Sequence, residues 1–119
     1  MLLTIDTQQK KDEMSQYVKD KNDFDNKLAE IGNEALVVVE FYANWCGPCK
    51  QIVPKIEGLF KDFPDLNLLK VDVDECEDLT SEYDIRAMPT FVFIKNNKIL
   101  DVFTGANIDE VKKYINKYM

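Results

Sequence analysis

The sequence has no histidine, no internal repeat, no Gly/Ser/Pro linker and no basic run longer than two residues. Its net charge of −7 comes from 15 Lys+Arg against 22 Asp+Glu, which argues against nucleic acid and anionic membranes as partners. No apolar run approaches the roughly 18 residues that a membrane helix needs. The N-terminus has no basic segment and soon turns polar, so a secretory signal is not expected.

What remains is typical of one soluble globular domain. With 119 residues, 45% of them hydrophobic and 31% charged, the chain can build one core but not two ordinary domains. Residues 7–13 are wholly polar. We therefore predict an N-terminal extension at residues 1–13 and a folded domain at residues 14–119. The three cysteines, an odd number, argue against a purely structural disulfide framework and favour a reducing, cytoplasmic location.

The most informative segment is Trp45-Cys46-Gly47-Pro48-Cys49-Lys50. It follows an apolar run at residues 36–43 that has the length and β-branched content of a buried central strand. Pro48 suits a first helical turn, and apolar residues then recur at helical spacing. Cys46 would lie at the helix N-terminus, where free N–H groups favour a thiolate, and Cys49 would be more shielded. This arrangement predicts reversible dithiol–disulfide chemistry.

Half of a zinc site is the alternative interpretation of these two cysteines. Zinc normally takes four ligands, and with no histidine and only Cys76 left, a complete site would need a carboxylate. Redox chemistry is therefore favoured. Cys76 itself lies in the acidic stretch 72–78, where negative charge raises a thiol pKa, so we expect a structural and not a catalytic thiol.

The remaining pattern alternates strands with helices and ends in a hairpin. Strands are predicted near residues 15–19, 36–43, 67–73, 90–95 and 99–103, and helices near 22–31, 48–63, 77–83 and 108–118. Gly32 can close the first helix, and Asn107 with Glu110 can form a capping box on the last. Asn96-Asn97 suits a tight turn. This order predicts an α/β fold, a mixed sheet with helices on both faces.

The sequence resembles the thioredoxin family, of the cytosolic eukaryotic type, from about Met14 to the C-terminus. The matching positions are Phe41, Ala43, the Trp45 to Lys50 motif, Pro54, residues 70–74, residues 85–90 and Gly105-Ala106. Two cysteines after a hydrophobic strand, with Met-Pro-Thr opening a later strand, are a specific combination. The resemblance implies the thioredoxin fold, a mixed sheet of four to five strands flanked by about four helices.

The resemblance also implies roles at the site. Cys46 would attack a substrate disulfide, Cys49 would resolve it, and the two would form the redox-active disulfide. Glu40 stands where the family has a buried aspartate that helps to deprotonate the second cysteine, and Lys70 matches a lysine near that acid. The alternatives are that strand twist lets Glu40 reach solvent and that Lys70 is a surface lysine.

A substrate-binding face is implied around Cys46. The matching proline in the family is cis, so that the residue before it offers its backbone to a peptide. The residues expected on this face are Trp45, Gly47, Pro48, Met88, Pro89, Thr90, Gly105 and Ala106. Asp74 would accept a hydrogen bond from Trp45, with a loop or capping acid as the alternative. Pro54 removes one backbone donor and should kink its helix.

The implied function is a monomeric protein-disulfide reductase without bound cofactor or metal. Its partners would be disulfide-containing proteins and a thioredoxin reductase that passes on electrons from NADPH. Gly47-Pro48 lacks the histidine of isomerases and oxidases, so the couple should favour reduction of other disulfides. Two other functions remain open. The first is a binding module that holds a regulatory partner on the same face and releases this partner when the module is oxidised. The second is a disulfide isomerase or oxidase, which conflicts with Gly47-Pro48 and with the missing secretory signal.

Overall fold

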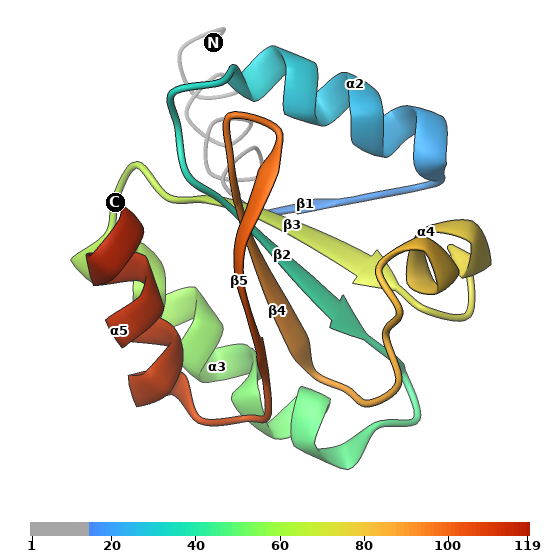
Figure 1. Ribbon diagram of the computed structural model, residues 1–119. Helices are drawn as coiled ribbons and strands as arrows, with labels where there is room; N and C mark the ends of the chain where they lie inside the picture. The colour runs from blue at the N-terminus through green and yellow to red at the C-terminus, as the bar shows by residue number, and fades with distance from the viewer. Residues whose placement is uncertain (1–14) are drawn as a thin grey trace, which may run out of the picture.

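The computed structural model describes residues 15–119, in which a mixed five-stranded sheet lies between two layers of helices (Figure 1). Its strands are β1 (Ser15–Tyr17), β2 (Val37–Tyr42), β3 (Asn67–Asp72), β4 (Thr90–Lys95) and β5 (Lys98–Thr104). Its helices are α2 (Lys21–Ile31), α3 (Gly47–Asp62), α4 (Glu77–Glu82) and α5 (Ile108–Tyr118). These elements confirm the predicted fold class. The predicted extension at residues 1–13 lies outside the described residues, and its boundary stays a prediction.

The sheet has the order β1-β3-β2-β4-β5. Strands β1, β3 and β2 run parallel, while β4 is antiparallel to β2 and β5 is antiparallel to β4. Helix α3 connects the parallel pair β2 and β3, because parallel neighbours need a long crossover. Asn96 and Asn97 connect β4 to β5 with left-handed φ values of 57° and 58°, as a tight hairpin requires. Strand β2 is central and covered on both faces, which explains why its residues other than Glu40 are apolar or aromatic.

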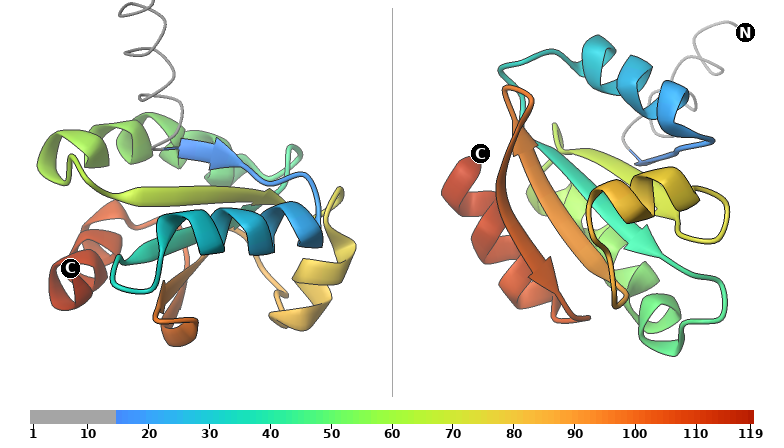
Figure 2. Two further views of the ribbon diagram at one scale, coloured as in Figure 1. Left: turned by 90° about the horizontal axis from the view of Figure 1, so that it is seen from above. Right: turned by 45° about the vertical axis from the view of Figure 1, so that its right-hand side comes forward.

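Each face of the sheet has its own hydrophobic core, because side chains alternate along a strand. Helices α2 and α4 cover one face, where Phe24 and Leu79 belong to the same buried cluster as Val37. Helices α3 and α5 cover the other face (Figure 2). Ile52 of α3 and Val111 of α5 are fully buried there. Burial of such side chains stabilises the fold by about 1.5–3 kcal/mol each. Packing of α3 on the sheet therefore fixes the position of its N-terminus.

The predicted helix ends are largely confirmed. Gly32 ends α2 with a φ of 91°, and its N–H donates to the Leu28 carbonyl oxygen at 3.1 Å. Asn107 caps α5, since its Oδ1 accepts the Glu110 N–H at 3.2 Å. The carboxylate of Glu110 accepts a hydrogen bond from Lys113 at 3.1 Å, a pairing that the capping-box prediction did not include.

Strand β1 is shorter than predicted and ends at Tyr17. The chain leaves the sheet early because Asp20 caps α2, with its carboxylate accepting the Asp23 N–H at 2.7 Å. Strand β5 is longer than predicted, since the turn uses only two residues. Among the helices of residues 15–119, none is long and apolar enough to cross a membrane.

Candidate active site

The two cysteines of the motif lie where β2 is followed by α3. Cys46 is the N-cap of α3, and a disulfide joins it to Cys49. The Cys49 N–H, one of the free amides in the first turn of this 16-residue helix, donates to Cys46 Sγ at 3.2 Å. In the reduced protein, these amides and the helix dipole would favour a thiolate at Cys46. Cys49 is 3% exposed and Cys46 is 6% exposed, which confirms the predicted order of shielding.

The backbone of Met88 lies against the outer cysteine. Its carbonyl oxygen is 3.6 Å from Cys46 Sγ, and the Met88–Pro89 peptide bond is cis, as the resemblance implies. Pro89 is buried, whereas Met88 is half-buried. A substrate disulfide that reaches Cys46 would therefore also meet the backbone of Met88.

The segment after β5 completes this surface. The Gly105 N–H donates to the Pro89 carbonyl oxygen at 2.9 Å. Gly105 has a φ of 136°, a backbone conformation that residues other than glycine rarely adopt. Four residues expected on this face are exposed: Trp45, Gly47 and Pro48, next to the cysteines in the chain, and Ala106, next to Gly105. The Met88 backbone thus lies beside Cys46 and the Gly105 backbone is bonded to Pro89, while the use of these groups as a substrate-binding face stays a prediction.

Thr90 does not fit the predicted face. It is buried, and its hydroxyl donates to the Ala87 carbonyl oxygen at 2.7 Å and lies 2.9 Å from the Thr104 hydroxyl. Its side chain therefore supports the loop that carries Met88 from beneath, since the hydroxyl is used within the fold.

Two aspartates hold the loop that carries Trp45. The Trp45 Nε1–H donates to Asp74 Oδ2 at 2.9 Å, the hydrogen bond that the resemblance implies. Helix α4 begins at the N-cap Cys76, so Asp74 does not cap it. Asp72 is buried and accepts Asn44 Nδ2–H at 3.2 Å and the Asp74 N–H at 2.9 Å, contacts that no sequence pattern indicated. Its position at the end of a predicted strand gave no sign of these partners.

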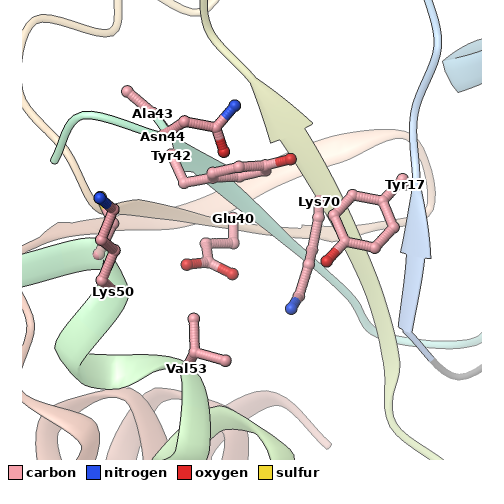
Figure 3. A pocket seen from close by; sticks show the side chains of 9 residues that line it. Tyr17, Glu40, Tyr42, Ala43, Asn44, Lys50, Val53 and Lys70 are labelled. Carbon is pink, nitrogen blue, oxygen red and sulfur yellow. The ribbon is translucent and has the colours of Figure 1, made fainter.

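Glu40 lies behind the cysteine pair, on the face of β2 that α3 covers. It is 2% exposed, so the alternative that strand twist brings it to solvent is wrong. Its carboxylate faces a cavity of about 210 Å³ (Figure 3). Cys49 also lines this cavity. Burial raises the pKa of Glu40 to about 7, although the Lys70 ammonium acts in the opposite direction. A carboxyl group with this pKa can accept or release a proton at neutral pH.

Lys70 is in register with Glu40 on the adjacent strand β3. It is only 8% exposed, so the alternative of a surface lysine is wrong. Its Nζ lies 5.4 Å from the ring centroid of Tyr17, and the rings of Tyr17 and Tyr42 are 6.2 Å apart, edge to face. Neither tyrosine is expected at the site from the sequence. Strand alternation places Tyr42 on the same face as Glu40, but no local sequence pattern predicts that Tyr17 lies beside Lys70.

Two further residues lie away from this chemistry. Cys76 is buried, with its Sγ 3.5 Å from the carbonyl oxygens of Val18 and Lys19, and burial, reinforced by nearby acids such as Glu75, raises its pKa. These contacts suit a structural thiol. Pro54 is an exposed residue inside α3, and the kink expected there stays a prediction. The described residues contain no cluster of three His, Cys, Asp or Glu that could hold a metal ion.

Comparison with known proteins gives consistent matches. The family model named Thioredoxin matches residues 4–117. Thioredoxin-T of Drosophila melanogaster is 47% identical over 85% of this chain and 64% of its own length, and the thioredoxin of Ophiophagus hannah is 41% identical over 89% of this chain and its whole length. The structure of Fasciola hepatica thioredoxin superposes with a TM-score of 0.82 at 40% identity, covering 87% of this chain and 99% of the other.

Site and comparisons agree with each other. The cysteine pair at the start of α3 occupies the active-site position of these relatives, and the five-stranded sheet with its helices matches their fold. The chain therefore belongs to the thioredoxin family and is a thiol–disulfide oxidoreductase that reduces protein disulfides through the Cys46–Cys49 pair.

Proposed function

We propose that Cys46 is the attacking thiol and Cys49 the resolving thiol of this reductase. The observation that supports this assignment is the position of Cys46 Sγ. It accepts the Cys49 N–H in the first turn of α3 and lies beside the half-buried Met88, whereas Cys49 lines the cavity at Glu40. A substrate can approach the first sulfur from outside, and the second can then attack it from within.

The cycle has two exchanges. The Cys46 thiolate attacks one sulfur of a substrate disulfide, which forms a mixed disulfide and releases the first substrate thiolate. The Cys49 thiolate then attacks Cys46 Sγ, which forms the Cys46–Cys49 bond and releases the second substrate thiolate. The substrate has gained two electrons and the protein has lost two.

Glu40 takes the proton of Cys49 in the second exchange, through water in the cavity. This role is supported by the burial of the carboxylate, by the cavity that it shares with Cys49, and by a pKa near 7. Lys70, in register beside it, keeps part of the Glu40 population ionised.

The oxidised protein is reduced again by a thioredoxin reductase, with NADPH as the electron source. Membership of the thioredoxin family supports this route. The protein acts as a monomer in the cytoplasm, where a reducing environment suits both the working dithiol and the buried free thiol of Cys76. Apolar and backbone groups at Trp45 and Met88 suit disulfide-bonded protein substrates of varied sequence.

A turnover assay tests the proposal. We would combine NADPH, a thioredoxin reductase, this protein and a disulfide-bonded protein, and we expect sustained NADPH consumption that requires all four. Absence of turnover, together with a stable partner captured by the reduced protein alone, would instead favour a redox-dependent binding module.

A further inference from the structure

Three side chains form a row across neighbouring strands, from the edge strand β1 to the central strand β2. Tyr17 of β1 is in register with Lys70 of β3, and Lys70 is in register with Glu40 of β2. Partners in register on adjacent strands lie about 4.8 Å apart and point to the same face. Figure 3 accordingly shows Lys70 between the ring of Tyr17 and the carboxylate of Glu40.

The ammonium of Lys70 is held from the side of β1. It is largely removed from solvent, and its Nζ lies 5.4 Å from the Tyr17 ring centroid, within cation–π range. Tyr42 contacts the same ring edge to face at 6.2 Å and so limits its rotation. Without this ring, the flexible lysine stem could turn its charge outward past β1, which is an edge strand of only three residues.

We propose that Tyr17 is a positioning residue for proton transfer, whose ring holds the Lys70 ammonium toward Glu40 and so keeps that carboxylate ionised. The inference rests on the proposed role of Glu40. Burial favours the neutral carboxyl group, and the charge of Lys70 is the opposing influence. A neutral carboxyl group cannot accept the proton of Cys49, so the position of Lys70 decides how much of the protein is competent for resolution.

The other groups near Glu40 do not replace Lys70. The titratable or charged groups that face this cavity are Lys70 from β3, Tyr17 from β1, Tyr42 from β2, and Cys49 and Lys50 from α3, while β4 places the apolar Phe91 opposite Glu40. Burial raises the pKa of Tyr42, so its hydroxyl stays neutral. Lys50 is exposed, and solvent screens its charge more than that of Lys70.

The test is a carbon-13 NMR titration of the Glu40 carboxyl group in the oxidised protein, where neither Cys46 nor Cys49 can titrate. Tyr17→Leu keeps apolar cover but removes the ring, and we expect it to raise the pKa of Glu40 by about 0.5, given the strength of exposed cation–π contacts. Tyr17→Phe is the matched control, because it keeps the ring face and should retain the parent pKa. Tyr17 is 61% exposed, so neither change threatens the core.

A second comparison, made in a variant that lacks the Lys70 charge, tests whether the pKa shift acts through Lys70 or only through lost solvent cover over Glu40. With Lys70→Met, Tyr17→Leu should cause no further change in the titration of Glu40. An unchanged or lower pKa in Tyr17→Leu alone, or a shift that persists with Lys70→Met, would overturn the inference. These titrations involve no turnover, so they remain informative even if the Glu40 carboxylate is not the base for Cys49.

Discussion

The charge of one buried side chain links the structure of this protein to its chemistry. Glu40 is one methylene longer than the aspartate that the family resemblance implies at this position, yet it is fully enclosed and faces the cavity shared with Cys49. Because its pKa is about 7, its ionisation changes within the physiological range. Both the rate of resolution and the stability of the fold should therefore depend on pH through this residue.

Glu40→Gln should slow resolution of the mixed disulfide by about 100-fold below about pH 7, the lower end of the usual contribution of a general base. Below about pH 7, the rates of parent and variant both rise with pH, so the ratio is constant. Above it, the parent levels off as Glu40 becomes fully ionised, while the variant keeps rising toward the pKa of Cys49, so the gap closes. Rapid-quench measurement of the mixed disulfide reads this step, and equal rates between about pH 6 and 8 would exclude the role.

The same substitution should increase stability at high pH. The folded-state pKa of Glu40, about 7, lies above its ordinary value of 4.5, so the folded state binds the proton more tightly and loses stability as pH rises between these values. Glu40→Gln removes this loss, and we expect a gain of the order of 3 kcal/mol above pH 7. Urea unfolding at about pH 4 and 8 checks the sign; a gain that is equal at both would contradict it.

Substitutions of the three cysteines should separate their roles. Cys49→Ser should accumulate a mixed disulfide with substrate, because Cys46 can still attack and nothing resolves the adduct. Cys46→Ser should accumulate none, and both variants should lose turnover. Cys76→Ser is the matched control and should turn over like the parent. Mass spectrometry of the substrate adducts distinguishes these outcomes. Adducts on Cys46→Ser and none on Cys49→Ser would invert the assignment of attacking and resolving thiols.

Among the helices and strands, substitutions of two glycines should change the stability of the fold in opposite directions. Gly58 lies inside α3, and a Cβ built there meets nothing within 4 Å, so Gly58→Ala should stabilise the protein by about 0.5–1 kcal/mol through helix propensity. Gly105 follows β5 with a φ of 136°, so Gly105→Ala should destabilise it by about 1–3 kcal/mol. Thermal unfolding measures both; a shift of the same sign would contradict the backbone argument.

The elements that the sequence predicts best are those with strong local patterns. The bounds of β4 and α5 agree with the prediction because alternation and helical spacing are intrinsic to each segment. Strand β1 was predicted too long, since a strand of three residues depends on its pairing with β3 and on the cap at Asp20. The same pairing brings Tyr17 to Lys70, so no local pattern could have indicated that contact.

The active site, like the strands and helices, could be predicted where a local sequence pattern marks its residues. Cys46, Cys49 and Met88 lie as expected, because a motif, a helix start and a proline mark them in the sequence. Thr90 and Asp72 differ, since what their side chains contact depends on loops distant in sequence. Sequence thus located the reacting atoms, whereas the groups that support them became apparent only from the packed structure.

For the whole molecule, the net charge of −7 should influence which substrates are reduced quickly. Asp74 and Glu75 add exposed negative charge close to Trp45. A disulfide peptide flanked by lysines should therefore react faster than one flanked by glutamates at about 0.01 M salt, and the difference should shrink near 0.15 M. Stopped-flow rates for the two peptides test this, and a preference that does not change with salt would rule out electrostatic steering.

The hydrogen bond between Trp45 and Asp74 also gives the protein a built-in optical reporter. The chain has one tryptophan, and its indole is fixed by Asp74 directly before the first cysteine of the bridge. Every photon emitted by tryptophan in this protein therefore originates next to the Cys46–Cys49 pair. Opening and closing of the bridge can thus be followed by intrinsic fluorescence, with no label attached to the surface that substrates must reach.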